Sequence, residues 1–448
     1  MENQISKLKA FNSPILKILF ILFIILLLMI PNFMIQDLIQ ERTTRKALIE
    51  SEVSKSYGRN QKIMAPLLRL PYSISYTSDD GQKVNSSKGT FTFTPNSSDL
   101  TGNIATSTRK RSIYEVVVYE AEMKMKSMLT DRGLTEANYP NHTIHYDKAH
   151  LIVGLSDPNG LSDDSDMSVN GTRLKLNGLS TYTNGELKYI KSKNFIYEPG
   201  DKLEVIANMN FKGTGDLMIE PIGEQMKVTL TSPWQDPSFT GTRLPDNYDT
   251  SEGFSSTWST NQYAHDYPTS WSDDYKVKNR NFAFGVDLIQ PVNEYSKNSR
   301  TAKYALLIIS LTFGIFFFFE ILLKKKVHPI QYILIGFALT VFYLLLLSIT
   351  EHLGFDKAYL ISSVATIGLI VSYASHILQT AKSTGMLGLL LTGLFTYIFI
   401  ILQMQDFALL AGALALFTVL SIVMLLSRKV DWYALSKGFS IKPENQIV

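Results

Sequence analysis

The residues in this sequence whose types most readily do chemistry are a glutamate and a histidine at the end of an apolar run. Glu351 and His352 interrupt the stretch FYLLLLSITEHLGFDKAYLI, residues 342–361. A carboxylate beside an imidazole can act as a general acid–base pair, and inside a bilayer it can act as a proton relay. The same two residues can equally form the hydrated end of a helix. Their interpretation therefore depends on where the membrane surface lies.

Two other stretches could bind a cation. Three of the seven histidines lie in NHTIHYDKAH, residues 141–150. In an extended strand His142 and His150 point to one face and His145 to the other, so we interpret them as strand residues rather than as a metal site. The acidic stretch GLSDPNGLSDDSD (154–166) lacks EF-hand spacing and is typical of a turn followed by a solvated loop. We expect no bound metal.

Composition narrows the chemistry further. The chain has no cysteine, which excludes disulfides, thiolate catalysis and cysteine-ligated metals, and favours a bacterial envelope protein. A net charge of +3 over 448 residues gives no basic field for nucleic acid. The sequence contains no nucleophile elbow, phosphate loop or carboxylate pair at catalytic spacing. We therefore expect a protein that is not an enzyme and needs no cofactor.

An aromatic stretch could line a binding groove. PWQDPSF (233–239) contributes Trp234 and Phe239, and Trp258 follows further along the chain. These three side chains form a candidate groove for an apolar or sugar ligand. Packing in the core of a sheet is the commoner explanation of such residues.

Six apolar stretches are long enough to cross a hydrocarbon core of about 30 Å. The first, residues 12–35, has Lys7, Lys9 and Lys17 at or before its amino end. No small-residue cleavage site follows it, so we interpret it as an uncleaved anchor. The other five stretches are residues 304–323, 330–349, 358–378, 386–403 and 407–426.

Charged residues orient these spans. Basic residues concentrate in the loops on one side and acidic residues on the other, with Lys357 as the exception. By the positive-inside rule, both termini lie in the cytoplasm and residues 37–300 lie outside. The basic side carries Lys324, Lys325, Lys326, Lys382, Arg428, Lys429 and Lys437, and the opposite side carries Glu351, His352, Asp356 and Asp406.

The long segment between the first two spans has the pattern of a β domain. After a helix that ends at Gly58, at least eight stretches such as SIYEVVVYEAEMKM (112–125) alternate with period two between Asn, Gly, Asp and Pro turns. The absence of βαβ spacing favours an antiparallel sandwich or curved roll. We expect a polytopic α-helical membrane protein with six transmembrane helices and a large antiparallel β-rich periplasmic domain inserted between the first two. The expected parts are an amino-terminal anchor, the β domain, a five-helix bundle and a cytoplasmic tail, at residues 1–36, 37–303, 304–427 and 428–448.

Ionisable residues near the spans are few. Glu320 precedes Lys324 by four residues, and His328 opens the next span, so these three residues form a candidate polar cluster at the cytoplasmic face. A transport path would show charges near mid-span or interrupted helices, and neither is evident. An ion transporter is therefore disfavoured.

The opposite face holds a candidate junction. Glu351 and His352 end one span at the level where Arg300 and Lys303 lead into another. We expect Glu351 to contact Arg300 or Lys303 and so to tie the helices to the base of the external domain. For His352 we favour an ordinary helix-end role over a pH sensor.

Local sequences along nearly the whole chain match one known pattern. They include QERTTR (40–45), FKGTGDLMIEP (211–221), TLTSPWQDPSFTG (229–241), FEILLKKKVHPIQYILIG (319–336) and YLLLLSITEHLGF (343–355). In this combination the chain resembles the CreD family of bacterial inner-membrane proteins, which is associated with cell envelope integrity. The resemblance implies an inner-membrane location but no reaction, cofactor or catalytic residue.

Three functions fit these observations. We favour a non-enzymatic inner-membrane protein that supports envelope integrity by binding or organising envelope components through its periplasmic domain. The alternatives are an envelope stress transducer that works with a partner, and a lipid or glycan carrier or enzyme with an apolar groove. The expected partners are the lipid bilayer and other envelope proteins, lipids or glycans, with no nucleic acid.

Overall fold

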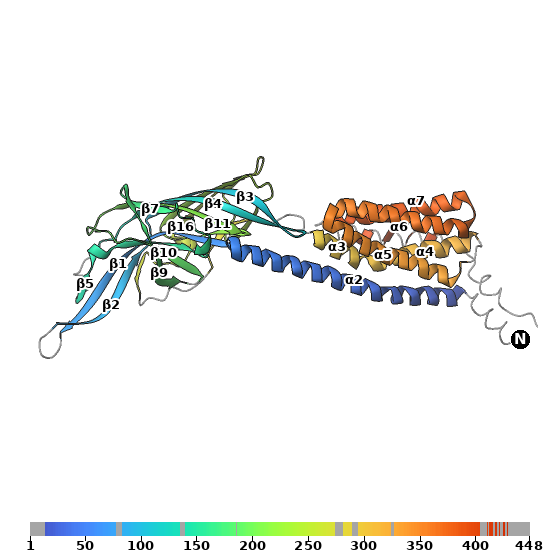
Figure 1. Cartoon of the computed structure of the whole chain (residues 1–448), viewed down its shortest axis with the longest axis horizontal. Coiled ribbons are helices and arrows are strands. Elements are labelled where there is room, and N and C mark those ends of the chain that lie inside the picture. The colour runs from blue at the N-terminus through green and yellow to red at the C-terminus, as the bar shows by residue number, and fades with distance from the viewer. Residues whose placement is uncertain are drawn as a thin grey trace, which may run out of the picture. The chain divides into compact units, whose positions relative to one another are not determined.

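The chain divides into two compact units. The computed structural model describes residues 14–77, 83–134, 139–184, 186–273, 281–288, 294–323, 327–403 and scattered residues between 410 and 428. The helical unit comprises Met1–Arg45 and Val292–Val448, and the β unit comprises Lys46–Pro291. Figure 1 shows the helices and strands of each unit, coloured along the chain.

Long apolar helices make up the helical unit. Four of them are long and apolar enough to cross a membrane, or five if α3 and α4, which meet at a bend of 46°, count as one span. The predicted sixth span, 407–426, lies largely outside the described residues. The helices are α2 (Pro14–Tyr57), α3 (Glu294–Lys303), α4 (Ala305–Leu323), α5 (Pro329–Leu353), α6 (Phe355–Leu378) and α7 (Ala381–Gln403).

The unit boundaries differ from the expected domain limits on both sides of the β unit, because the helical unit includes residues 37–45 and residues 292–303, which were expected in the external domain. Sequence analysis grouped residues 294–303 with the external domain, whereas α3 packs against α5, α6 and α7 in the helical unit. Half of its ten residues are buried there although the helix is polar overall. The polar side chains of α3, which suggested an external segment, are in fact buried in contacts with neighbouring helices.

A single glycine joins α5 to α6. Gly354 ends one helix and precedes the next with φ 77°, a conformation that favours glycine because it has no Cβ. The backbone N–H of Gly354 donates to the carbonyl of Thr350 at 3.1 Å. The segment Leu353–Phe355, which follows the candidate junction residues Glu351 and His352, is therefore a tight turn between two spans.

Two sheets build the β unit. In the first sheet the path runs β14 (Ser238–Gly241), β18 (Phe284–Asp287), β12 (Asp216–Glu220), β1 (Gln61–Thr77), β6 (His150–Leu155), β10 (Leu187–Ser192) and β9 (Leu176–Asn184), with β2 (Lys83–Phe93), β5 (His142–Ile144) and β17 (Ser270–Ser272) joined beside it. In the second sheet the order is β15 (Asn247–Asp249), β16 (Phe254–Asn261), β13 (Gln225–Ser232), β3 (Ser97–Arg111), β4 (Tyr114–Leu129), β11 (Leu203–Thr214), β7 (Asp166–Val169) and β8 (Thr172–Leu174).

The sheets are mixed rather than purely antiparallel, which corrects one part of the predicted fold class. Most neighbouring strands are antiparallel, but β1 pairs with β12 and β3 pairs with β13 in parallel. Each parallel pair joins strands more than a hundred residues apart in sequence. Alternation along a strand identifies its buried face but does not determine the direction of a distant neighbour.

One hydrophobic core lies between the two sheets. Apolar residues of both sheets form a single buried cluster, and β11 shows the underlying pattern, with every second residue from Leu203 to Phe211 buried. β1 is buried along most of its length, and its register with β6 shifts between Met64 and Leu67. Pro66 lies within this irregularity, as expected for a residue that cannot donate to a sheet ladder.

Candidate functional site

A polar network links five helices, α2, α3, α5, α6 and α7, at one end of the helical unit, here called the Arg42 end. It begins with Glu294, the first residue of α3. A carboxylate oxygen of Glu294 accepts a hydrogen bond from the backbone N–H of Phe355 at 2.5 Å. Gly354 has no side chain that could cap α6, so Glu294 caps that helix from α3.

Lys297 is the buried cation of this network. Its ammonium donates to Gln403 at 3.0 Å and to Asp356 at 3.4 Å, and it lies 5.4 Å from the centre of the Phe355 ring. The amide of Gln403 in turn donates to Asp356 at 2.7 Å. The Lys297 side chain is only 11% exposed, so it holds the ends of α3, α6 and α7 together in a partly desolvated site.

Glu351 lies in this network, but its partner differs from the predicted one. Its carboxylate is 3.5 Å from the Arg42 Nε of α2 and accepts a hydrogen bond from the Tyr295 hydroxyl at 3.5 Å. Within the described residues, neither Arg300 nor Lys303 has a recorded bond to Glu351. The expected contact with Arg300 or Lys303 is therefore wrong. It assumed that the chain entering α4 lies nearest to α5, whereas α2 supplies the cation from more than three hundred residues away.

His352 is exposed at the end of α5, and no hydrogen bond is recorded for it among the described residues. Its neighbour Glu351 is half-buried and ion-paired. Adjacent residues of a helix point in directions about 100° apart. Glu351 and His352 therefore do not form the acid–base pair that their adjacency suggests.

A smaller cluster lies at the opposite end of the helical unit, here called the Lys17 end. Lys17 of α2 forms an ion pair with Glu320 of α4, whose second carboxylate oxygen accepts from the Tyr332 hydroxyl at 3.3 Å. His328 is the N-cap of α5 and forms a capping box with Gln331. Lys324, the third residue of the predicted cluster, lies outside the described residues.

Helix α2 packs between these two ion pairs through a seam with a seven-residue repeat. Apart from Ile24, its buried positions from Ile21 to Ile39 are spaced alternately by four and three residues, and the half-exposed Arg42 continues the spacing, which is the pattern of a coiled-coil interface. Halfway along, the Asn32 side chain donates to the carbonyl of Ala302 at 3.3 Å, and Leu28 packs so closely on Gly336 that a Cβ there would lie 2.2 Å from it. The seam comprises Ile21, Ile25, Leu28, Asn32, Ile35, Ile39 and Arg42.

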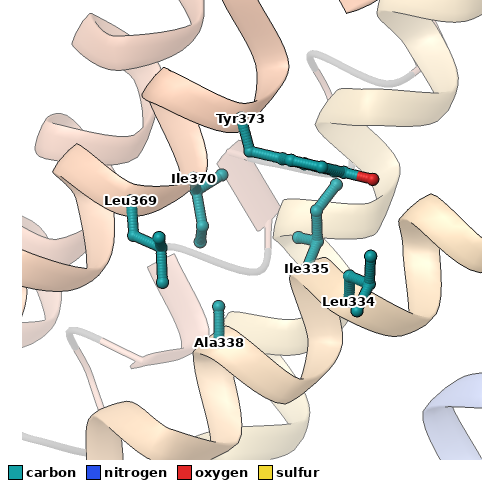
Figure 2. A pocket seen from close by; sticks show the side chains of 6 residues that line it. All are labelled: Leu334, Ile335, Ala338, Leu369, Ile370 and Tyr373. Atoms are coloured by element: carbon teal, nitrogen blue, oxygen red, sulfur yellow. The ribbon is translucent and has the colours of Figure 1, made fainter.

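Two apolar clefts lie beside this seam. The α2–α5 cleft, of about 420 Å³, is lined by Pro31, Met34, Ile35, Leu38, Thr340, Val341 and Leu344. The α5–α6 cleft, of about 230 Å³, is lined by Leu334, Ile335, Ala338, Leu369, Ile370 and Tyr373. Figure 2 shows the second cleft, in which the Tyr373 ring of α6 extends over Ile335 of α5.

The candidate groove of the β unit is part of the core. Trp258 is fully buried, and its ring lies 5.8 Å from that of Phe239 and 5.6 Å from that of Phe284. Because Trp258 belongs to the second sheet and Phe239 and Phe284 belong to the first, these contacts join the sheets. Trp234 packs on the same cluster from its edge. Trp234, Phe239 and Trp258 thus support the sheet-core explanation rather than an open groove.

The β unit contains a buried arginine that was not predicted as a site residue from the sequence. Arg69 of β1 is directly opposite His150 of β6 on one side and Thr92 of β2 on the other, so the three side chains share one face of the sheet. The guanidinium forms an ion pair with Asp273 and lies 4.4 Å from the centre of the Tyr182 ring. Burial lowers the pKa of Arg69, and the Asp273 carboxylate opposes that effect.

The histidines near Arg69 have different environments. Burial, together with the positive charges of Lys191 and Arg69, lowers the pKa of His150 to about 4, although the backbone carbonyl of Lys148 opposes this. His145 lies 3.1 Å from the Ser73 hydroxyl, and His142 packs on Tyr72. The three histidines of the 141–150 stretch therefore have separate structural partners.

The acidic loop forms turns. The Asp157 carboxylate accepts from the backbone N–H groups of Asn159 and Arg59 at 3.3 and 3.1 Å. Further along, Asp164 and Asp166 accept from the side-chain amides of Asn210 and Asn208, both at 2.9 Å. These carboxylates stabilise the loop and its contact with β11.

Together these observations define a class of protein: a polytopic helical membrane protein with a large β-rich domain between its first two described spans. The chain belongs to the CreD family, because the family model described as "Inner membrane protein CreD" matches residues 13–433. Inner membrane protein CreD of Escherichia coli (strain K12) is 33% identical over 419 residues, which cover 92% of each chain. A multi-pass inner-membrane location follows.

Solved structures show only a distant likeness. An M1 zinc metallopeptidase from Deinococcus radiodurans is 11% identical with a TM-score of 0.22, covering 38% of this chain and 40% of that one. A two-domain M1 zinc metallopeptidase bound to L-arginine is 8% identical with a TM-score of 0.20 and the same coverage. Such values support no inference about fold or activity.

Proposed function

We propose that this protein supports envelope integrity without catalysing a reaction, by holding its β unit in the periplasm, where that unit binds envelope components. In this proposal the chain crosses the inner membrane six times, with both termini in the cytoplasm. The observation that carries the proposal is the pair of ion pairs that α2 makes with other helices, one at Lys17 near its first residue and one at Arg42, 15 residues before its last. Lys17 and Arg42 are 25 residues apart, or about 37 Å along a helix, which brackets a hydrocarbon core of about 30 Å.

The charges at the two ends support the orientation. In the sequence Lys324–Lys326 directly follow α4, whose Glu320 is at the Lys17 end, and Lys382 is the second residue of α7. Glu294, Glu351 and Asp356 lie at the Arg42 end. The positive-inside rule then assigns the Lys17 end to the cytoplasm. The part of α2 in the helical unit ends at Arg45, and α3 begins with Glu294 at the same Arg42 end. In this proposal the β unit, which the chain forms between these two points, therefore belongs on the periplasmic side.

The roles of the charged groups favour a structural function over catalysis. Glu294 caps a helix, Lys297 joins three helices, and Glu351 connects α2 to α5. Each of these groups is engaged in positioning a helix. A catalytic acid or base would instead face a space that a substrate could enter.

The outer face of the second sheet is the surface we assign to binding. Thr101 of β3 is opposite Thr229 of β13, which is opposite Thr257 of β16, so hydroxyl groups run across three strands. Lys124 and Asn208 extend the same row across β4 and β11. Hydroxyl and ammonium groups in one row suit hydrogen bonding to a hydroxyl-rich glycan, while the Asn208 amide already donates to Asp166.

Single-cysteine labelling tests the topology, because the natural chain has no cysteine. Tyr263, which is 86% exposed in the β unit, and Thr380, between α6 and α7, are suitable positions. A membrane-impermeant maleimide should label Tyr263→Cys in intact spheroplasts and Thr380→Cys only after lysis. The reverse pattern would refute the periplasmic placement.

Sedimentation with purified peptidoglycan sacculi tests the binding proposal. The full-length protein in detergent should sediment with sacculi, and Thr101→Glu with Thr229→Glu should reduce the bound fraction several-fold. Tyr263→Glu, an exposed position outside the row, is the matched control. Binding that is absent, or that all these variants retain equally, would contradict a glycan-binding role for this face.

A further inference from the structure

The α2–α5 cleft has a charged rim at one end. Along α2 its lining runs from Pro31 to Leu38, and Arg42 and Arg45 follow one and two turns later. At 100° per residue, both arginines lie within about 30° of the middle of the cleft, whereas Glu41 lies about 70° away and Asp37 about 110° away. The two arginines are therefore in line with the cleft, and the nearest carboxylates on the same helix are not.

Side-chain direction brings Arg45 closer to the cleft. Helical side chains lean toward the helix N-terminus, and the cleft lies on the N-terminal side of Arg45. On α5, Ser348 and then Glu351 follow the lining residues toward the same rim. Around the helix axis each lies within about 35° of the middle of the lining. Arg45 and Ser348 are both exposed. The rim thus offers a guanidinium and a hydroxyl beside the mouth of an apolar groove.

The rim carries one net positive charge. Arg42 is paired with Glu351 at 3.5 Å, so these two charges compensate each other. Arg45 has no recorded ion-pair partner among the described residues. One surplus positive charge matches the single negative charge of a phosphodiester, which guanidinium groups bind through paired hydrogen bonds.

The cleft walls suit a hydrocarbon chain. Thr340 is the one residue with a polar side chain in the lining, and its hydroxyl donates to the carbonyl of Gly336 at 3.0 Å within its own helix. Leu38, at the rim, is 21 residues from Lys17, or about 32 Å along α2. If Lys17 lies at one boundary of the hydrocarbon core, the cleft ends at the other boundary, where lipid phosphates lie.

We propose that the α2–α5 cleft binds an anionic glycerophospholipid, with one acyl chain in the cleft and its phosphate on Arg45 and Ser348. The lipid belongs to the leaflet at the Arg42 end. It fills the groove beside the α2 seam and so supports the packing of α2 on α5. This inference concerns the helical unit and does not depend on what the β unit binds.

The α5–α6 cleft supplies a matched control. It is also apolar and lies between two spans, and Leu369 in its lining is 61% exposed, compared with 48% for Val341 in the α2–α5 cleft. A tryptophan at either position fills its own cleft with a side chain of the same size. The two substitutions therefore separate an effect on the proposed site from a general effect of a bulky residue on a membrane-facing surface.

Native mass spectrometry of the full-length protein tests the proposal. The protein is delipidated in dodecyl maltoside and titrated with palmitoyl-oleoyl phosphatidylglycerol or with the zwitterionic phosphatidylethanolamine of the same chains. We expect one phosphatidylglycerol to bind preferentially. Arg45→Gln should weaken this binding about fivefold, the contribution expected for one arginine at a membrane surface. Val341→Trp should abolish it, and Leu369→Trp should leave it unchanged.

Three results would overturn the proposal: equal binding of the two lipids, unchanged phosphatidylglycerol binding in Arg45→Gln, or equal loss in the two tryptophan variants. Arg45 is exposed, so its replacement tests the rim without disturbing the packed seam. Size-exclusion chromatography verifies that each variant remains monodisperse. Glycerol phosphate without acyl chains should not bind, which distinguishes a lipid site from a site for free phosphate.

Discussion

The helical unit and the β unit place polar and apolar residues in opposite ways. On α2, Leu26 and Met34 are more than 60% exposed while Asn32 is buried. On β4, by contrast, Glu120 and Glu122 are exposed while Ala121 and Met123 are buried. The first pattern suits a surface covered by lipid and the second a surface covered by water. The residues exposed on each unit therefore indicate whether lipid or water surrounds that unit.

The two units also differ in how they accommodate buried charge. In the described ion pairs of the helical unit, Lys17, Arg42 and Lys297 each pair with a carboxylate near the end of another helix. The β unit places Arg69 inside, between an aromatic ring and the Asp273 carboxylate. The comparison predicts that the core and buried charge of the β unit contribute more to stability than the ion pairs of the helical unit.

The largest expected effect is the loss of the inter-sheet tryptophan. Trp258→Ala should lower the free energy of unfolding of the β unit by about 3–5 kcal/mol, because it leaves a cavity between the sheets. Urea unfolding of the full-length protein, followed by far-UV circular dichroism, measures the change. Tyr263→Ala, at an exposed position, should change it by less than about 0.5 kcal/mol. A similar small loss for Trp258→Ala would show that this residue does not join the sheets.

The second effect is a pH dependence that originates at His150. Its pKa in the folded protein is about 4, below the ordinary value of 6.5, so the unfolded chain takes up a proton first as the pH falls. Stability should therefore decline from about pH 7 to pH 4, by up to about 3 kcal/mol from this residue. His150→Gln should remove that part of the decline, whereas His145→Gln should not. Identical pH profiles for the wild type and His150→Gln would contradict the prediction.

A smaller effect is expected from the buried lysine of the helical unit. Lys297→Met keeps the length of the side chain but removes its hydrogen bonds to Gln403 and Asp356, and should cost about 1–2 kcal/mol. The Asp356 carboxylate is mostly exposed, so water compensates for part of the loss. Thermal unfolding in detergent micelles measures the change. A loss of stability as large as that of Trp258→Ala would contradict the prediction that the core of the β unit contributes more to stability than the charged contacts of the helical unit.

The smallest effect is the coupling between Arg42 and Glu351. A double-mutant cycle with Arg42→Gln and Glu351→Gln should give a coupling energy of about 0.5–1 kcal/mol, since both groups are only partly buried. The parallel cycle with Lys303→Gln should be additive. Coupling of Glu351 to Lys303 rather than to Arg42 would restore the contact expected from the sequence.

Much of the architecture could be predicted from local sequence. Apolar length identified the spans that correspond to α2 and α4–α7, and period-two alternation identified strands such as β4 and β11. These signals are strong because the choice of helix or strand, and of buried or exposed face, is expressed within about ten residues. The candidate sites were less predictable. Glu351 was recognised as a residue of interest, but its partner Arg42 and the neighbouring Lys297 were not.

The sequence alone determined which segments face lipid and which alternate as strands, because hydropathy is a property of neighbouring residues. Only the tertiary structure decided that Glu351 pairs with Arg42, that Glu294 caps α6, and that Trp258 lies between two sheets. Each of these contacts joins residues far apart in the chain. Such pairs depend on the packing of whole helices and on the register of whole strands, which no local pattern specifies.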